Sequence, residues 1–322
     1  MAAARPAQRI IPTATATATT SPGLVRPGHA GNAALCGARR GGTMSDAACA
    51  VRVGGVDVRD AVIEAARFLA DHTDQPITLG DVADHVGYSP FHLARSFERR
   101  LGVPPGQFLA AHRFQHAKRL LLAGDDRVID ICHAVGFTSV GTFTARFAAA
   151  VGASPVAFRR LPDALADAPP RPVLVPGSAP GGGAVGGSVR LSPAAAALLG
   201  AGASVYVGLF PRRAARGFPV SGSLLAGAGD FLLTDVPPGT YWVLATALPA
   251  RADLPAQLVP ATSVVGAAPR PVRVTAAGQC HHRDVHLDVA QTWQPPVLVA
   301  LPPLASPHAQ DWRRRRPERI LG

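Results

Sequence analysis

The sequence predicts a multi-domain α and β protein, with an all-α double helix-turn-helix domain followed by an antiparallel β-sandwich domain. Three observations support this prediction. Apolar residues recur at helical spacing between about residues 58 and 161, and part of that pattern occurs twice. Beyond about residue 187 the apolar period changes to two, which is typical of strands. A chain of 322 residues is also longer than one typical domain.

Composition shifts divide the chain into five predicted regions. Gly and Pro are abundant, with 33 and 31 residues, and they cluster between the patterned segments. The regions are a low-complexity head (1–55), a helical domain (56–161), a Pro/Gly linker (162–186), a β-sandwich (187–292) and a Pro-rich, Arg-rich tail (293–322). The favoured interpretation of the head is that translation starts at Met44, and the alternative is a disordered arm. Its Arg-containing, acid-poor composition is also that of a transit peptide.

The charge favours a polyanionic partner without locating it. The formal net charge is +11, and cations near phosphates release condensed counterions on binding. Much of this charge lies in the head and in the run Arg313 to Arg316, whereas residues 58–161 hold 12 basic against 10 acidic side chains. Net charge alone therefore does not identify residues 58–161 as a DNA-binding region.

The four cysteines show no paired spacing, which argues against a disulfide framework and fits a reducing cytoplasm. The longest apolar stretch, residues 194–210, contains three glycines and is barely long enough for a membrane span. We expect it to form a turn and a strand. The sequence thus indicates a cytoplasmic, nucleoid-associated protein with no membrane partner and no cofactor.

Helix start and stop signals mark the first helix-turn-helix unit. Thr78 and Asp81 have capping-box spacing before the segment LGDVADHV, and Gly87 can end this helix in the left-handed conformation. Ser89 then caps a second helix with proline at its first position, and Gly102 closes it. Two short helices joined by a tight glycine turn are the helix-turn-helix signature.

A longer helix is expected from Pro105 to about Leu122, and the same pattern then repeats. Residues 128–135 form a short helix, Gly136 makes the turn, and Ser139 caps the next helix. An offset of 50 residues aligns seven pairs of caps, core residues and turn glycines: Ser89/Ser139, Leu93/Phe143, Phe97/Phe147, Leu101/Val151, Gly102/Gly152, Pro105/Pro155 and Phe108/Phe158. These matches indicate an internal duplication.

The segments at residues 77–109, 113–122 and 129–160 resemble the DNA-binding domain of the AraC/XylS family. The resemblance covers about a third of the chain. It implies seven helices, two helix-turn-helix units joined by a rigid central helix, and a base-contacting position at Arg95. The chain departs from the family pattern at three positions, where Pro104 replaces the usual Ser cap, Cys132 the usual Ala, and Ala145 a frequent Arg.

A helical wheel separates a buried side from a DNA-facing side in the first recognition helix. Leu93, Phe97 and Leu101 share the buried side, so Phe91, His92, Arg95 and Arg99 face outward. Arg95 is the strongest candidate for base readout, because a guanidinium can bind guanine with two hydrogen bonds. The alternative is a solvated Arg95 that pairs with Glu98 or Glu64.

The second recognition helix has a nearly bare outward side, formed by Gly141, Thr142, Ala145, Arg146 and Ala149. Thr142 and Arg146 can reach phosphate, and Ala145 can meet a thymine methyl group. We therefore predict that the first unit supplies most sequence specificity and the second mainly anchors. The predicted DNA-binding residues are Ser89, Phe91, His92, Arg95, Arg99, Ser139, Thr142, Ala145 and Arg146.

In the second half, strands are predicted at residues 188–191, 204–210, 219–225, 230–236, 240–248, 271–276 and 284–289. Residues 229–245, GDFLLTDVPPGTYWVLA, resemble a strand-turn-strand of transthyretin-like and carboxypeptidase regulatory-like domains. This resemblance implies a binding or docking module without catalysis. Cys280, His281, His282 and His286 are metal-ligand types; we favour a solvated strand face over a zinc or copper site.

These patterns together predict a bacterial sequence-specific transcription regulator, with activation or repression left open, that is not an enzyme. Its expected partners are double-stranded DNA, RNA polymerase, and a small-molecule effector or protein at the β domain. The alternative is a non-specific or architectural DNA-binding protein that uses Arg-rich tails. A repair enzyme with a similar helical unit is disfavoured, because no nucleophile arrangement or phosphate loop is recognisable.

Overall fold

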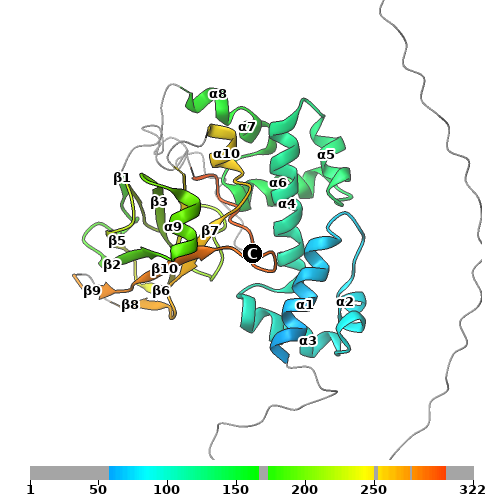
Figure 1. The fold of residues 1–322 in the computed structure, drawn as a ribbon, viewed down its shortest axis with the longest axis horizontal. Helices are drawn as coiled ribbons and strands as arrows, with labels where there is room; N and C mark the ends of the chain where they lie inside the picture. Colours follow the sequence, from blue (N-terminus) through cyan, green and yellow to red (C-terminus); the bar gives the residue numbers. More distant parts are fainter. Residues whose placement is uncertain (1–57, 167–172, 250–252, 276–277, 302–322) are drawn as a thin grey trace, which may run out of the picture. The chain divides into compact units, whose positions relative to one another are not determined.

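The computed structural model describes residues 58–166, 173–249, 253–275 and 278–301 (Figure 1). All of them belong to one compact unit, whose bounds are Arg52 and Gly322. The predicted head, the start at Met44 and the arginine run at 313–316 lie outside the described residues.

The helical domain contains the seven helices that the family resemblance implies. They are α1 (Val58–Asp71), α2 (Leu79–Val86), α3 (Pro90–Leu101), α4 (Pro105–Ala123), α5 (Val128–Ala134), α6 (Val140–Val151) and α7 (Pro155–Arg159). Helix α4 runs between α1–α3 on one side and α5–α7 on the other (Figure 1). The short helix α8 (Leu161–Leu165) follows α7.

The predicted caps and turns are confirmed. The Thr78 side chain accepts a hydrogen bond from the Asp81 backbone N–H, while the Asp81 carboxylate accepts one from the Thr78 backbone N–H at 2.8 Å. Gly87, Gly102 and Gly152 all adopt positive φ angles, of 71°, 78° and 88°. An L side chain is strained at such angles, so glycine at these positions fixes where each helix ends.

Each helix-turn-helix unit has a hydrophobic core of its own. The first core includes Leu93, Phe97 and Phe108, and the second includes the equivalent Phe143, Phe147 and Phe158. The apolar residues that the 50-residue offset pairs are each at most 6% exposed. The paired residues are therefore equivalent in packing as well as in sequence. These buried aromatic rings supply much of the apolar burial that stabilises the domain.

All seven predicted strands are present, and the structure adds three short ones. The strands are β1 (Val173–Val175), β2 (Gly183–Leu191), β3 (Ser204–Phe210), β4 (Gly222–Leu225), β5 (Asp230–Val236), β6 (Gly239–Leu248), β7 (Val264–Ala267), β8 (Val272–Val274), β9 (Cys280–His282) and β10 (Val285–Val289). Strands β1, β7 and β9 were not predicted. Each has only three or four residues, too few to show alternation.

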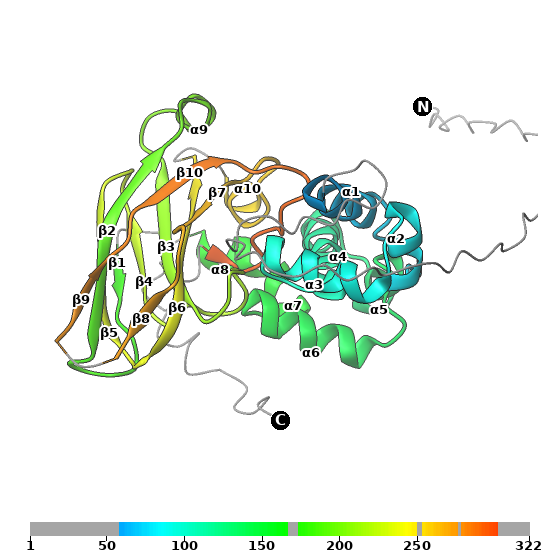
Figure 2. The same ribbon diagram turned by 90° about the horizontal axis from the view of Figure 1, so that it is seen from below.

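The strands of the described residues join in one ten-stranded sheet, ordered β1-β4-β3-β6-β7-β10-β2-β5, with β8 beside β6 and β9 beside β2 (Figure 2). The predicted sandwich of two sheets is therefore not confirmed. The prediction of purely antiparallel pairing was also wrong, because β2 pairs in parallel with both β9 and β10. These partners lie far apart in the sequence, and a long connection does not impose the antiparallel pairing of a hairpin.

Two segments differ from their predicted roles. The predicted linker at 162–186 contains β1 and the start of β2. The apolar stretch at 194–210, predicted as turn and strand, begins inside helix α9 (Pro193–Leu199), which Ser192 caps, before β3. None of the described helices is long and apolar enough to cross a membrane.

The start of the predicted tail is packed into the fold. Leu298, Val299, Ala300 and Leu301 are each at most 8% exposed. Leu298 and Ala300 lie in the core of the second helix-turn-helix unit, together with Leu258 of helix α10 (Leu254–Leu258), and the Ala300 N–H donates to Val151 O at 2.9 Å. Prolines flank this short apolar run on both sides, so the sequence predicted a Pro-rich tail instead of a buried segment.

Candidate nucleic-acid interface

Helix α3 presents the outward side that its wheel predicts. Phe91 is 72% exposed, and His92, Arg95 and Arg99 are also exposed, whereas Leu93 and Phe97 are buried. The helix thus offers an aromatic ring, an imidazole and two guanidinium groups on one accessible side. An arrangement of this kind can contact base edges and phosphates in a major groove.

Arg95 makes no ion pair within the described part of the chain. Glu64, one of the two carboxylates expected as alternative partners, instead lies 3.8 Å from Arg67 and 3.5 Å from His85. The Arg95 guanidinium lies over the Phe91 ring, 5.6 Å from its centroid. This contact orients the side chain while leaving its N–H donors available for a ligand.

Helix α6 repeats the buried side of α3 but not its outward side. Thr142, Ala145, Arg146 and Ala149 are exposed. At the 50-residue offset Arg95 corresponds to Ala145, and Arg146 corresponds to the buried Ser96. Arg146 therefore occupies a different position on its helix from Arg95, and its guanidinium lies 5.8 Å from the Phe137 ring centroid.

The two N-cap serines make equivalent side-chain hydrogen bonds. The Ser89 hydroxyl accepts a hydrogen bond from the His92 N–H at 3.4 Å, and the Ser139 hydroxyl accepts one from the Thr142 N–H at 3.3 Å. Both serines are exposed at the start of a twelve-residue helix. The helix dipole concentrates positive potential there, which favours phosphate oxygens.

Arg113 of helix α4 joins the two units, a role that the sequence alone did not predict. Its guanidinium donates to Thr73 O at 2.7 Å and Gln75 O at 2.6 Å in the first unit, and to Gly136 O at 2.8 Å in the second. A Cβ at Gly136 would lie 2.9 Å from the Arg113 Cζ, so glycine there also makes room for this contact. No local sequence signal marks Arg113, because its partners lie 23 to 40 residues away.

Lys118 is a buried cation of helix α4. Its Nζ donates to Leu298 O at 3.4 Å and lies 5.6 Å from the Phe158 ring centroid. Burial lowers the pKa of Lys118 from 10.5 to about 7, with a smaller contribution from nearby Arg119. Burying a charged amine costs free energy unless the amine is paired or loses its proton. The hydrogen bond from Lys118 to Leu298 therefore joins the second unit to the C-terminal segment, but burial of the charged form opposes it.

Cys132 is a core residue of the helical domain, and three of the domain's histidines lie closer to its surface. Cys132 is fully buried, and burial raises the pKa of its thiol. His85 and His133 are exposed, and His116 is partly buried.

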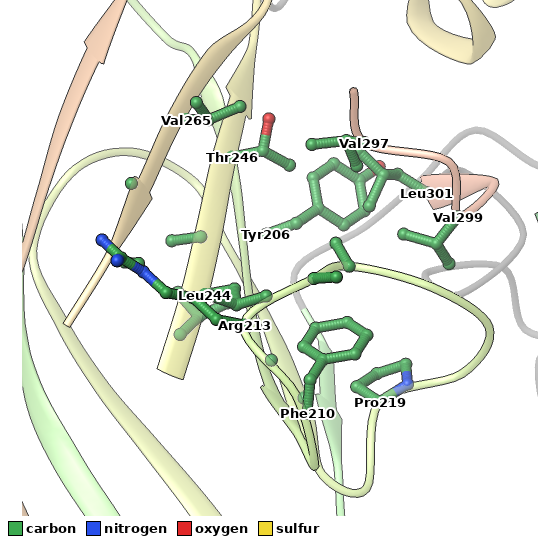
Figure 3. A pocket seen from close by; sticks show the side chains of 18 of the residues that line it. Tyr206, Phe210, Arg213, Pro219, Leu244, Thr246, Val265, Val297, Val299 and Leu301 are labelled. Atoms are coloured by element: carbon green, nitrogen blue, oxygen red, sulfur yellow. The ribbon is translucent and has the colours of Figure 1, made fainter. Parts of the chain in front are cut away.

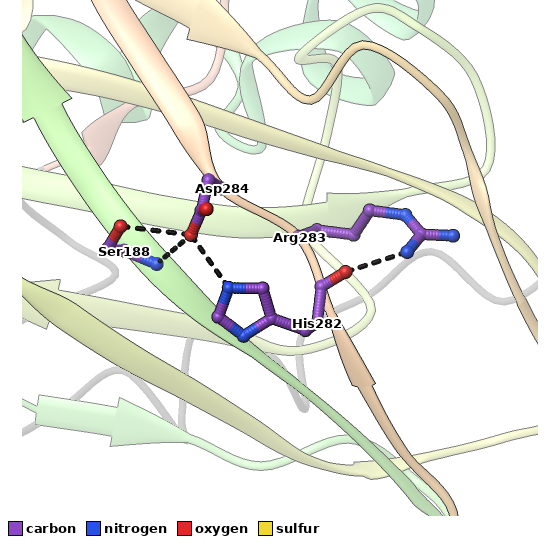
Figure 4. Close-up of polar contacts among 4 residues, drawn as sticks. All are labelled: Ser188, His282, Arg283 and Asp284. Atoms are coloured by element: carbon purple, nitrogen blue, oxygen red, sulfur yellow. Dashed lines mark hydrogen bonds and ion pairs between the residues drawn. The ribbon is translucent and has the colours of Figure 1, made fainter.

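The histidine-rich segment of the β domain forms a polar contact between strands (Figure 4). The Asp284 carboxylate accepts hydrogen bonds from the Ser188 N–H at 2.8 Å and hydroxyl at 2.9 Å, and the His282 Nε2 lies 2.9 Å away. These bonds, chiefly those from Ser188, lower the pKa of Asp284. Among the residues that the structure describes, no three His, Cys, Asp or Glu side chains are placed to hold a metal ion.

Comparison with known proteins places the similarity in the helical domain. Residues 82–161 match the family model described as "Helix-turn-helix domain". The melibiose operon regulatory protein of Escherichia coli K12 is 34% identical over 94 residues, which are 29% of this chain and 31% of that protein. The transcriptional activator AarP of Providencia stuartii is 36% identical over 83 residues, which are 26% of this chain and 62% of that protein.

The match to these relatives is limited to part of each protein, and the chain spans about a third of the melibiose regulator. Among solved structures, the DNA-binding domain of AdpA in complex with a target DNA is 26% identical, covering 32% of this chain and 94% of that chain with a TM-score of 0.31. The sequence matches, the duplicated caps and the two buried cores agree on the helical domain: residues 82–161 form a helix-turn-helix domain similar to those of AraC/XylS-type transcriptional regulators.

Proposed function

We propose that this chain is a sequence-specific transcription regulator in which helix α3 supplies most of the base readout and helix α6 mainly contacts phosphates. The observation that carries this proposal is the difference between two equivalent outward faces. Arg95 is exposed and without an ion pair in the described residues, whereas Ala145 stands at the matching position of α6. A guanidinium can discriminate guanine, but a methyl group offers only an apolar contact to thymine.

The contacts of Arg113 support a fixed separation of the two recognition helices. Its hydrogen bonds reach both units from the central helix. In this proposal the helices enter successive major grooves on one face of the duplex, about 34 Å apart, and one chain covers a non-palindromic site. Ser89 and Ser139 then place helix N-termini near phosphates, while Phe91, His92, Arg99, Thr142 and Arg146 complete the DNA contacts.

Regulation of transcription adds further proposed partners. The matched relatives carry the names of an operon regulator and a transcriptional activator. By analogy, this chain would contact RNA polymerase while it is bound to DNA. Its location would then be the nucleoid in the cytoplasm. The β domain, which lies outside the matched residues, would sense an effector or bind a partner.

The test compares Arg95→Ala with Arg146→Ala on a selected genomic duplex and on a scrambled duplex. We expect Arg95→Ala to reduce the specificity ratio about 5- to 150-fold, corresponding to about 1–3 kcal/mol of base discrimination. Arg146→Ala should weaken both duplexes equally. Arg190→Ala, which removes an exposed arginine of the β domain, controls for the loss of one charge. An equal loss on both duplexes for Arg95→Ala would contradict its proposed role.

The second candidate function is that of a non-specific or architectural DNA-binding protein. The net charge of +11 favours it, and the chain is 33% identical over 106 residues to a protein named for origin binding, the Right origin-binding protein of Escherichia coli K12, covering 33% of this chain and 35% of that protein. A salt titration distinguishes the two candidates. A regulator keeps a specificity ratio of about 10³ or more, whereas an architectural protein binds specific and random duplexes alike.

A further inference from the structure

An apolar cavity of about 290 Å³ lies between the sheet and the C-terminal segment, residues 293–301 (Figure 3). Strands β3, β6 and β7 contribute Phe210, Leu244 and Val265, and the C-terminal segment contributes Val297 and Leu301. No lining residue is an aspartate or a glutamate. The volume is close to the lower limit for small-molecule sites, and an apolar lining with few polar groups is typical of them.

One polar atom in this lining has no protein partner. Tyr206 is 6% exposed, and its hydroxyl makes no hydrogen bond within the described part of the chain. Burial raises the pKa of Tyr206, so the hydroxyl keeps its proton and can donate. Thr246, also in the lining, already donates to Val264 O at 2.8 Å. A buried hydroxyl without a partner costs free energy, and an acceptor on a ligand would remove that cost.

We propose that this cavity binds a small, largely apolar molecule that carries a hydrogen-bond acceptor, and that Tyr206 donates to this acceptor. The molecule is the effector of the DNA-binding domain, a role that rests on the proposed function. Arg100 and Leu101, at the end of recognition helix α3, also line the cavity. An occupant therefore lies against the helix that is proposed to read DNA.

The loop between β3 and β4, residues 211–221, extends this link to both recognition helices. It supplies Arg213 and Pro219 to the cavity wall. A Cβ built at Gly102, the C-cap of α3, would lie 2.8 Å from the Arg213 Cβ, and one at Gly152, the C-cap of α6, would lie 3.3 Å from the Phe218 ring. The loop thus touches the same position in both copies of the duplication.

Hydrogen bonds fix this loop on the helical domain. The Gly217 N–H donates to Ala150 O at 2.7 Å, and Arg216 donates to the Gln107 side chain at 2.8 Å. A ligand that favours one position of the loop consequently favours one position of the recognition-helix ends. That differential contact is what allosteric coupling between two sites requires.

The first experiment uses the full chain and the fluorescent probe 1-anilinonaphthalene-8-sulfonate, an aromatic anion with acceptor oxygens. We expect saturable binding to one site. Tyr206→Phe should weaken it about 2- to 10-fold without lowering the melting temperature, because the lost hydroxyl had no protein partner. Leu244→Trp should abolish binding by filling the cavity. Leu232→Trp, at an exposed leucine of β5 that does not line the cavity, is the matched control and should bind normally.

Unchanged probe affinity in both Tyr206→Phe and Leu244→Trp would overturn the site. A chain that ends after Leu301 provides a further test, because an affinity at least tenfold higher than that of the full chain would mean that residues 302–322 are the occupant.

Measuring duplex affinity with and without saturating probe separates this proposal from the proposed function. A shift of threefold or more that disappears in Leu244→Trp supports the effector role, and specific DNA binding that ignores the probe overturns it. Probe binding by a chain that does not discriminate between duplexes would contradict the proposed function while the cavity site stands.

Discussion

The two helix-turn-helix units have the same buried residues and different exposed ones. Ser89 and Ser139 cap their helices alike, and Phe97 and Phe147 are both fully buried. On the outward side, however, Arg95 is matched by Ala145. The comparison teaches that packing constrains the inner positions of both copies, while the outer positions are free to acquire different roles toward DNA.

The cores of the two units also differ in how the rest of the chain completes them. Leu258, Leu298 and Ala300 are buried members of the second core. Among the described residues, those that the first core receives from outside the helical domain are Ala214 and Trp293, and both are partly buried. The second unit is therefore more closely integrated with the C-terminal half. Substitutions in the two units should differ accordingly.

The largest expected effect comes from removing the equivalent buried rings. Phe97→Ala and Phe147→Ala should each lower the free energy of unfolding by about 3–5 kcal/mol, because a cavity replaces a buried ring. Phe147→Ala should cost more, since its ring contacts Phe114, Phe143 and Phe158, with centroids 5.6 to 5.9 Å away. Urea denaturation of the full chain measures both.

Phe91→Ala is the control for these two variants, because Phe91 is 72% exposed and should change stability little. A greater loss for Phe97→Ala than for Phe147→Ala would show that the second core is not the more integrated one.

The next effect concerns Lys118, which stands where the first unit has Phe68. Between pH 7 and 10.5 the folded chain keeps this amine neutral while the unfolded chain binds a proton, because burial lowers its pKa to about 7. Stability should therefore rise with pH across this window by about 1.4 kcal/mol per pH unit from this group. Lys118→Met should remove that slope, as measured by denaturation midpoints at several pH values.

Phe68→Met is the matched substitution in the first unit and should leave the slope in place. If Lys118→Met retained the wild-type pH dependence between pH 7 and 10.5, the buried amine could not be its source.

A substitution at Arg113 tests whether this residue holds the two units at a fixed separation. Arg113→Met removes three hydrogen bonds to carbonyl groups of both units, and we expect a loss of about 2 kcal/mol or more in stability together with weaker binding to the selected duplex. Arg119→Met, an exposed arginine on the same helix, is the control. The link between units would be refuted by identical stability and binding of the two variants.

An arginine can also be introduced at the position of α6 that is equivalent to Arg95. Ala145→Arg places a guanidinium at the position equivalent to Arg95 and should add about 1–3 kcal/mol of discrimination for one base in the second half-site. Ala149→Arg adds the same charge one turn further along the helix. Binding selections with both variants check the outcome, and a uniform gain on all sequences from Ala145→Arg would contradict direct readout.

The smallest effects should come from the caps. Ser89→Ala and Ser139→Ala each remove one side-chain hydrogen bond to a backbone N–H and should cost about 1 kcal/mol of stability. Thermal unfolding should give similar losses for both, since each hydroxyl accepts the same kind of hydrogen bond, from the backbone N–H three residues ahead. A large difference between them would mean that the two helix starts are not equivalent.

Local signals explain why the helical domain could be predicted from the sequence. The Thr78 capping box, the Ser89 and Ser139 caps and the closing glycines all act within four residues, so they are legible without the fold. The outward position of Arg95 also followed from helical periodicity alone. Its contact with DNA remains a prediction, as does that of the other proposed DNA-binding residues.

Contacts between distant segments explain what could not be predicted. The parallel pairing of β2 with β10, the bonds of Arg113 across the two units, and the burial of Leu298 each join residues far apart in the sequence. The burial of the Tyr206 hydroxyl without a partner in the described residues likewise depends on the packing of the C-terminal segment against the sheet.

The amino-acid sequence was enough to predict the helices, their ends, the duplication and the exposed sides of α3 and α6, because these depend on neighbours within a few turns. The sheet order, the spacing of the two units and the cavity beside helix α3 followed from the three-dimensional fold alone. Those features depend on which distant surfaces bury each other, and no short stretch of sequence encodes that choice.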